Sequence, residues 1–230
     1  MEFTLLGAAL LAAAAVYGVL YYEARRANAL ECTRELWDVV LIAAMSGVLA
    51  GRLAAMVIGG TNPLTNLPDV LIVRSGVDTG WASLTALAVF GVSARRDLWR
   101  IADAVAPAAL AGLAAWHAAC TMRGACLGTP SDLPWAVASE GSAVGRHPVE
   151  IYAALALLAG AIVLIVGKRR HPPAGMVGAA ALLIAALVRL LTEPLRPVIG
   201  AGPTAWYGAG AAVGAALALW RWRVGRRSSS

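Results

Sequence analysis

Charged residues are scarce in this sequence. Only 14% of its 230 residues are Asp, Glu, Lys or Arg, whereas proteins on average use about 25%. Hydrophobic residues make up 60% of the chain, and the mean hydropathy is +0.71. Such a chain has too few polar groups to cover the surface of a soluble domain, which excludes that class of protein.

Zinc-binding and nucleic-acid-binding signatures are also missing. The three cysteines, Cys32, Cys120 and Cys126, have no Cys-x-x-Cys or Cys/His spacing that would indicate zinc. The net charge is +6, but the basic residues lie between apolar runs and form no patch interleaved with aromatic residues. We therefore expect no nucleic-acid partner. Internal repeats and soluble segments are absent too, so we expect one integral membrane domain over residues 1–230.

Long apolar runs dominate the chain instead. A spanning helix needs about 20 apolar residues, and strands are excluded because an open sheet cannot span lipid. The first run has no basic start and no small-residue cleavage site, so we interpret it as a retained helix and not a signal peptide. The sequence predicts an all-α polytopic membrane protein with about seven transmembrane helices, the third of them short. The predicted helices cover 3–22, 39–58, 80–93, 101–122, 149–167, 174–192 and 203–220.

The basic residues orient these helices. Thirteen of the 19 Lys and Arg residues fall in alternate connections and the C-terminal tail, against four in the other connections. The positive-inside rule places the richer set in the cytoplasm, which puts the N-terminus outside and the C-terminus inside. The richer set comprises Arg25, Arg26, Arg34, Arg95, Arg96, Arg100, Lys168, Arg169, Arg170, Arg221, Arg223, Arg226 and Arg227.

Ionisable residues within the predicted helices are candidates for function, because charges there usually face a cavity or the bundle interior. Arg52 lies roughly 20 Å along its helix, which is too deep for an ordinary snorkelling arginine. Arg189 and Glu193 are four residues apart on one face, and a purely structural ion pair remains an alternative. Asp103 lies near the inner interface, which favours an ordinary structural role, whereas for His117 a packed, hydrogen-bonded structural role and a function are equally open.

The outer side also has a cationic cluster. Arg52 and Arg189 are joined there by residues from the connections, namely Arg74, Arg123, Arg146 and His147. Because guanidinium groups bind phosphate in a bidentate manner, the expected ligand is an anionic phospholipid headgroup or another anion. An anion transporter is an alternative, although no broken helix pair or inverted repeat supports it.

Five motifs, in order along the chain, resemble those of the prolipoprotein diacylglyceryl transferase family. The fourth is similar to the family's Arg-His-Pro-x-Gln-Leu-Tyr motif, and the fifth to its Arg-x-x-x-Glu-x-x-Arg motif. The resemblance covers most of the chain and implies a multi-pass protein of the bacterial cytoplasmic (inner) membrane. The five motifs are Tyr17-Gly18; Trp37-Asp38 with Gly47, Gly51 and Arg52; Asp103 with Pro107 and Gly128; Arg146-His147-Pro148-Val149-Glu150-Ile151-Tyr152; and Arg189 with Glu193 and Arg196.

The sequence departs from the family pattern at several positions. The family has a histidine in a Gly-Gly-x-x-x-His-Gly-Gly setting, whereas residues 74–81 contain none. The signature arginine is replaced by His117, the signature asparagine by Cys120 and the signature acid by Ala125. These departures leave two hypotheses: an active enzyme, or a silent relative that binds anionic phospholipid or lipoprotein precursors without turnover.

The resemblance implies transfer of a diacylglyceryl group from phosphatidylglycerol to the lipobox cysteine in the signal peptide of a prolipoprotein. This reaction needs a base to form the thiolate and cations around the phosphate, but no metal or organic cofactor. Phosphatidylglycerol, the prolipoprotein and membrane lipids are the expected partners. The implied catalytic residues are His117, His147, Arg189 and Glu193, with either histidine as the base. The implied substrate-binding residues are Tyr17, Arg52, Arg74, Gly128, Arg146, Tyr152 and Arg196.

Two cysteines, Cys120 and Cys126, lie at the predicted outer end of the fourth helix, in the oxidising compartment. They are six residues apart across a sequence where the helix is expected to stop. A turn there would allow a disulfide, which would brace the loop holding Gly128 beside His117. Two buried free thiols are the alternative.

Overall fold

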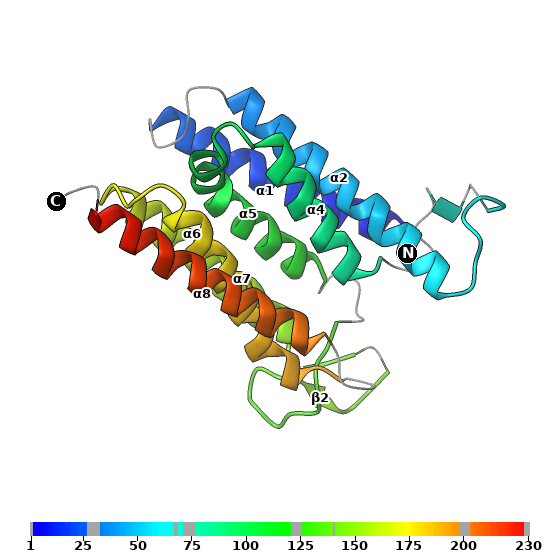
Figure 1. Ribbon diagram of the computed structural model, residues 1–230. Coiled ribbons are helices and arrows are strands. Elements are labelled where there is room, and N and C mark those ends of the chain that lie inside the picture. Colours follow the sequence, from blue (N-terminus) through cyan, green and yellow to red (C-terminus); the bar gives the residue numbers. More distant parts are fainter. Residues whose placement is uncertain are drawn as a thin grey trace.

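The computed structural model describes residues 2–26, 33–66, 69–70, 77–120, 126–139, 141–197 and 203–227. Seven α-helices in this part of the chain coincide with the seven predicted apolar runs, so the all-α prediction is confirmed (Figure 1). A two-stranded hairpin, β1 (Val137–Ala138) with β2 (Gly145–Arg146), and a short 3-10 helix, η2 (Glu193–Leu195), complete the fold. The helices are α1 (Glu2–Arg25), α2 (Thr33–Ile58), α4 (Thr79–Ser93), α5 (Leu98–Cys120), α6 (Val149–Lys168), α7 (Met176–Thr192) and α8 (Thr204–Arg227).

Several of the helices are able to cross a membrane. Five segments are long and apolar enough, within Gly7–Arg25, Leu36–Ile58, Leu98–Cys120, Val149–Lys168 and Met176–Leu195. Helix α4 has 15 residues, about 22 Å of helix against a hydrocarbon core of about 30 Å. Helix α8 is long enough but ends in a basic turn. These features are those of a multi-pass membrane protein, while seven crossings and the orientation of the termini stay predictions.

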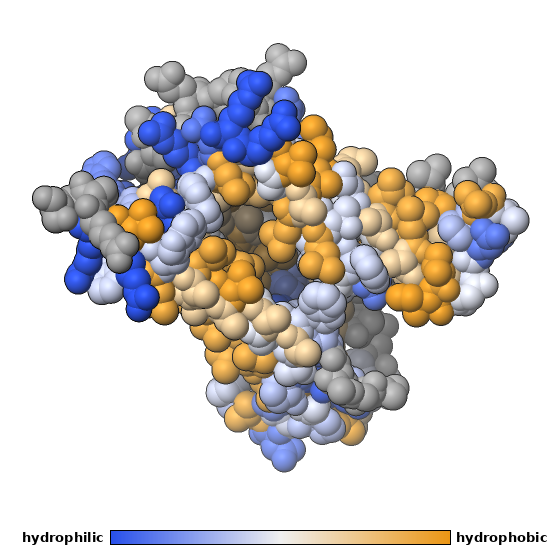
Figure 2. Space-filling model, viewed as in Figure 1, coloured by the Kyte–Doolittle hydropathy of each residue, from blue (hydrophilic) through white to orange (hydrophobic). Residues whose placement is uncertain are grey.

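Apolar side chains also cover the outer faces of the helices. Leu155, Val163 and Leu191 are 61%, 64% and 72% exposed, as expected for side chains that face lipid. Figure 2 shows hydrophobic residues along the flanks, and the most hydrophilic residues gathered toward the end where the C-terminus lies.

Helix α5 is the centre of the bundle, because it packs against α1, α2, α6 and α7. One apolar core lies between α5, α6 and α7 around Leu110, Leu157 and Val177. A second core lies between α1, α2 and α5 around Leu20 and Leu36. The most buried helix therefore holds His117 near its end and can present it to groups from its neighbours.

Small residues set the spacing of the helices, as expected for packing in lipid. Gly47 and Gly51 lie on the face of α2 that contacts α4. A β-carbon on Gly47 would approach the carbonyl oxygen of Ala82 to 2.7 Å, and one on Gly51 would approach that of Asp78 to 2.6 Å. Both contacts are too close for any larger residue, so this part of the family-like motif in α2 has a packing role.

Polar contacts close the end of the bundle that carries the C-terminus. Lys168 of α6 pairs with Glu23 of α1, whose side chain is fully buried. Asp103 of α5 accepts hydrogen bonds from the backbone N–H groups of Gly175, at 2.6 Å, and Gly178, at 2.8 Å, at the start of α7. Asp103 therefore has the structural role that its position near the interface favoured. The helix ends that carry the thirteen basic residues of the richer set thus lie together at one end of the molecule.

Candidate active site

A line of polar side chains joins α5, α6, α7, η2 and α8 at the opposite end. In α7, Arg189 donates through Nη2 to the hydroxyl of Tyr207 in α8, at 2.9 Å. The same Nη2 lies 3.8 Å from Oε2 of Glu193, which confirms the predicted pairing of these two residues. The Nε atom of Arg196 lies 3.9 Å from that oxygen, so Glu193 connects the two arginines.

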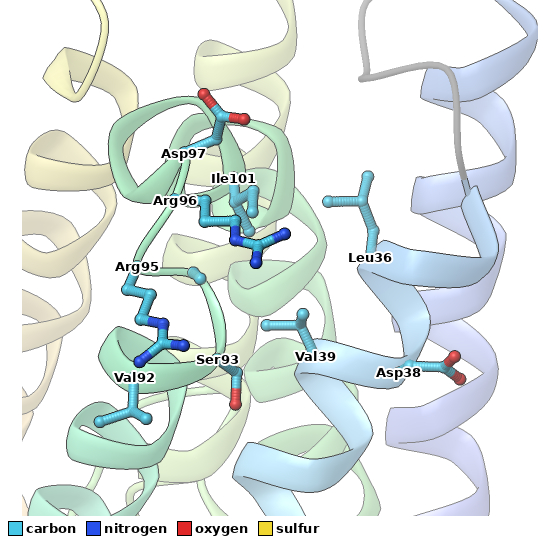
Figure 3. A pocket seen from close by; sticks show the side chains of 10 residues that line it. Leu36, Asp38, Val39, Val92, Ser93, Arg95, Arg96, Asp97 and Ile101 are labelled. Atoms are coloured by element: carbon cyan, nitrogen blue, oxygen red, sulfur yellow. The ribbon is translucent and has the colours of Figure 1, made fainter.

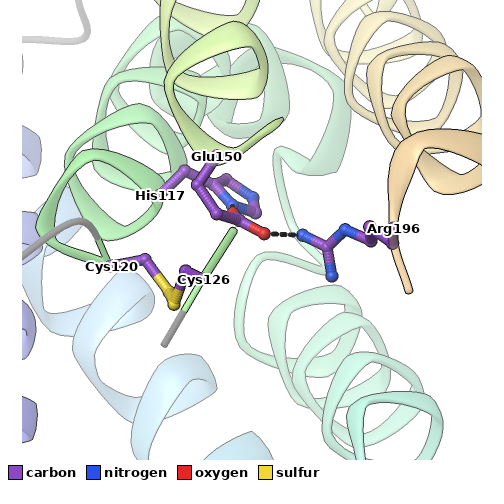
Figure 4. Close-up of a disulfide and its surroundings, with 5 residues drawn as sticks. All are labelled: His117, Cys120, Cys126, Glu150 and Arg196. Carbon is purple, nitrogen blue, oxygen red and sulfur yellow. Dashed lines mark hydrogen bonds and ion pairs between the residues drawn. A yellow bond between two sulfur atoms is a disulfide. The ribbon is translucent and has the colours of Figure 1, made fainter. Parts of the chain in front are cut away.

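Glu150 continues this line into the centre of the bundle (Figure 4). Its Oε1 atom accepts a hydrogen bond from Nη2 of Arg196, and its Oε2 atom contacts Nδ1 of His117. Glu150 is 7% exposed and His117 9% exposed. Charged and polar groups interact more strongly there than in water because the local dielectric constant is lower. We call Tyr207, Arg189, Glu193, Arg196, Glu150 and His117 the polar cluster.

Local sequence explains how these side chains reach one another. Pro194 stops α7, and the chain turns through η2 before Arg196 becomes extended. Glu150 lies in the first turn of α6, where the helix dipole favours a negative charge. His117 lies in the last turn of α5. The end of α5, the start of α6 and the turn after α7 therefore place an imidazole, a carboxylate and an arginine side by side.

Three atoms of the polar cluster are buried without a hydrogen-bond partner: Arg189 Nη1, Arg196 Nε and Glu193 Oε2. Most buried polar atoms in proteins have a partner, so unsatisfied ones call for an explanation. Two of the three belong to guanidinium groups, which suit an anion such as a phosphate. Figure 2 also shows a hollow near the middle of the visible face, between α4 and α8, with hydrophilic residues in its depth.

A disulfide braces the end of α5 next to the polar cluster. Cys120 and Cys126 are bonded, with their Cα atoms 5.8 Å apart, which confirms the prediction of a bridge. It ties the helix end, three residues beyond His117, to the segment that leads into Gly128 (Figure 4). Gly128 donates to the carbonyl of His147 at 2.8 Å. A β-carbon on Gly128 would collide with Val149 and with the carbonyl of Leu195, so only glycine fits.

The remaining residues of the fourth motif form a cap beside the polar cluster. Arg146 donates to the carbonyl of Gly128 at 3.1 Å. The hydroxyl of Tyr152 accepts from Nε1 of Trp135 at 2.7 Å, and Nδ1 of His147 lies 3.5 Å from the same hydroxyl. The structure therefore brings Arg146, His147, Tyr152 and Gly128 together, adjacent to the polar cluster through Val149 and Glu150.

The other predicted residues lie elsewhere. Arg52 is 2% exposed and donates through Nε and Nη2 to the carbonyl of Asp69, at 3.0 and 2.6 Å, so it holds the loop after α2. Tyr17 is 52% exposed, and its ring packs edge-on against Trp37 near the start of α2, with centroids 5.7 Å apart. Tyr17 is thus not brought beside the polar cluster. Arg74 lies outside the described residues.

Sequence reasoning missed two members of the polar cluster. Glu150 was noted only as part of a motif, and Tyr207 was not singled out. A signal for Glu150 was available, because a carboxylate stands where the motif has an amide while an imidazole stands at the signature arginine position. No comparable signal marked Tyr207, which lies on the next helix.

A second candidate site lies at the opposite end of the bundle. A cavity of about 680 Å³ lies between α2, α4 and α5, and Arg95, Arg96, Asp38 and Asp97 are among its ten lining residues (Figure 3). These charged side chains are exposed to solvent. Its candidate nucleophile, Ser93, and its candidate bases, Asp38 and Asp97, are exposed as well, and the lining contains no histidine or cysteine. The buried polar cluster is therefore the better candidate for chemistry.

Apolar helices long enough to span a membrane, with a buried cluster of arginine, glutamate and histidine side chains at one end, define a multi-pass membrane protein with a polar site inside its helix bundle. Within this class, the chain belongs to the prolipoprotein diacylglyceryl transferase family, whose sequence model matches residues 5–219. The resemblance stated from the motifs is thereby confirmed.

Individual relatives carry the same description. The phosphatidylglycerol–prolipoprotein diacylglyceryl transferase of Methylococcus capsulatus is 31% identical over 181 residues, covering 75% of this chain and 68% of the relative. The enzyme so named in Solidesulfovibrio magneticus is 31% identical over 156 residues, covering 63% and 57%. That of Aeromonas hydrophila is 32% identical over 115 residues, covering 49% and 42%. The matched part thus spans between two fifths and about two thirds of these relatives.

Proposed function

We propose that this chain transfers a diacylglyceryl group from phosphatidylglycerol to the lipobox cysteine of a prolipoprotein, as the names of its relatives describe. The observation that carries the proposal is the guanidinium group of Arg189. It is held by Tyr207 and Glu193, yet retains a buried Nη1 atom without a hydrogen-bond partner. Such a group is oriented to receive a phosphate oxygen.

The chemistry needs what the polar cluster offers. The thiol sulfur attacks the glyceryl carbon that is bonded to phosphate, the carbon–oxygen bond breaks, and glycerol phosphate leaves with the bonding electrons. Arg189 and Arg196 would stabilise the charge that builds on the departing phosphate. A base must remove the thiol proton, and His117 and His147 are the two candidates on this side of the bundle.

The orientation belongs to the same proposal. The basic helix ends would face the cytoplasm, which places the polar cluster and the disulfide on the outer side of a bacterial inner membrane. A disulfide is typical of an oxidising compartment, so the bridge supports this orientation. Phosphatidylglycerol of the outer leaflet and the lipobox of an exported precursor would both reach the site from there.

Purified protein in phosphatidylglycerol vesicles, incubated with a lipobox peptide, tests the proposal. Mass spectrometry should show the peptide gaining one diacylglyceryl group, and a peptide with serine in place of the cysteine should gain none. Arg189→Ala should lower the rate by about 10²-fold or more, as expected for loss of a charge-stabilising group. Arg170→Ala is the matched control, since Arg170 is exposed at the opposite end, and it should keep the wild-type rate.

If wild-type protein in phosphatidylglycerol vesicles gave no lipidated peptide, that result would contradict the transferase proposal. Retained binding of phosphatidylglycerol or of the peptide in that case would identify a silent relative, the second hypothesis from the sequence.

A further inference from the structure

We propose that Glu150 is a positioning residue that makes His117, and not His147, the base of this reaction, with Nε2 of His117 as the atom that takes the thiol proton. The inference rests on the proposed transferase function. It goes further by assigning the base, the nitrogen atom and the group that orients it.

The geometry selects one nitrogen of His117. Its Nδ1 atom contacts Oε2 of Glu150, and a carboxylate at that position favours a proton on Nδ1. The lone pair is then on Nε2, the nitrogen that points away from Glu150. A carboxylate that holds an imidazole in this tautomer is the arrangement that prepares histidine for proton transfer in serine hydrolases.

Both partners of the contact between Glu150 and His117 are held in place. Arg196 donates to the other carboxylate oxygen of Glu150, Oε1, and Glu150 is 7% exposed. Turning the carboxylate away would leave a buried charge without partners, which is unfavourable. On the side of His117, the disulfide at Cys120 holds the end of α5, one turn beyond the histidine (Figure 4). Both partners of the contact are thus restrained independently.

His147 lacks such support. Its Nδ1 atom lies 3.5 Å from the hydroxyl of Tyr152, which already accepts a shorter bond from Trp135. In the part of the chain that the structure describes, no carboxylate lies within ion-pair distance of His147. The hydroxyl can donate to Nδ1 or accept from it, so the contact does not select a tautomer.

The step balances with the groups present. The S–H proton moves to Nε2 of His117 and gives an imidazolium, which the Glu150 carboxylate stabilises. The sulfur forms its bond to the glyceryl carbon as the carbon–oxygen bond to phosphate breaks. The imidazolium then gives its proton to the departing phosphate, so glycerol phosphate leaves as a monoanion and His117 returns to its neutral form.

Kinetics in the peptide assay test the assignment of the base. His117→Gln should lower kcat by about 10²–10⁴-fold, the usual contribution of a general base. Glu150→Gln, which is nearly isosteric, should lower kcat by at least about 10-fold and leave the KM for lipid within about two-fold. His171→Gln, at the opposite end of the bundle, is the matched histidine control and should keep the wild-type rate. Full activity in His117→Gln, or a larger loss in His147→Gln, would overturn the inference.

The tautomer provides a readout that does not depend on turnover. The chain has three histidines, so ¹⁵N-histidine labelling and single His→Gln variants assign each signal. At alkaline pH, where histidine is neutral, wild-type His117 should show a protonated Nδ1 and an unprotonated Nε2. Glu150→Gln should give a mixture of tautomers, whereas Arg196→Gln should preserve the Nδ1–H form. A protonated Nε2 in the wild type would refute the role of Glu150.

The two readouts separate failure of this inference from failure of the proposed function. Wild-type protein that lipidates no peptide refutes the transferase, while the spectrum still decides whether Glu150 sets the tautomer. Wild-type protein that is active but has the opposite tautomer refutes the inference alone. Thermal unfolding of each variant in detergent shows whether a lost activity reflects loss of fold.

Discussion

Removing the disulfide gives the most quantitative test of how the site is braced. The bridge between Cys120 and Cys126 ties the end of α5 to the segment that enters Gly128. We consider the double change Cys120→Ser with Cys126→Ser, which keeps side-chain size nearly constant. In the folded protein, His117 is still held by α5 and by its contact with Glu150. We therefore expect the change to act on stability more than on chemistry.

The expected magnitude follows from the length of the closed loop. The two cysteines are six residues apart, and in the chain-entropy view a loop of that size stabilises the folded state by about 2 kcal/mol. For a chain of this size, each kcal/mol corresponds to a change in Tm of about 2–4 °C. The double variant should thus unfold about 4–8 °C below the wild type. Its loss of kcat should be smaller than that of His117→Gln.

Thermal unfolding in detergent, with and without a reductant, checks this reasoning. The reductant should lower the Tm of the wild type to that of the double variant and leave the variant unchanged. Thiol counting on denatured, non-reduced wild-type protein should find one free thiol. Three free thiols would refute the bridge. A variant with the wild-type Tm would refute the loop-closure argument.

Three further predictions concern other parts of the chain. Lys168→Met leaves Glu23 buried without its partner and should lower the free energy of unfolding by about 3–5 kcal/mol. Adding Glu23→Leu should restore most of the lost Tm. A double variant whose Tm stays as low as that of Lys168→Met would contradict the pairing. Gly128→Ala should lower the free energy of unfolding by about 1–3 kcal/mol through overpacking and should also lower kcat. An unchanged Tm and an unchanged kcat would show that the loop accommodates a methyl group. For orientation, Ala143→Cys should react with impermeant maleimide in intact cells and Arg170→Cys only after lysis, in a background without other free thiols; the reverse pattern would invert the topology.

The sequence by itself determined the helices and the separation of their basic ends from the ends that carry the candidate site. A run of about 20 apolar residues in lipid has to satisfy its backbone hydrogen bonds internally, so each run becomes a helix regardless of its neighbours. Hydropathy placed helix ends less well, because interfacial turns are polar. Helix α2 begins at Thr33 and not at residue 39, and α8 continues to Arg227. Short-range geometry could also be predicted, as for Arg189 with Glu193 and for the bridge between two cysteines six residues apart.

Contacts between helices were decided by the tertiary structure alone. His117 and Glu150 are 33 residues apart and meet because α5 packs against α6 with the end of one beside the start of the other. Tyr207 reaches Arg189 only through the packing of α7 on α8. Apolar patterning in lipid does not fix the rotation of a helix that is hydrophobic on every face. The close fit of small residues at each interface does so, and that fit determined which histidine meets a carboxylate and which arginine nitrogens stay buried without a hydrogen-bond partner.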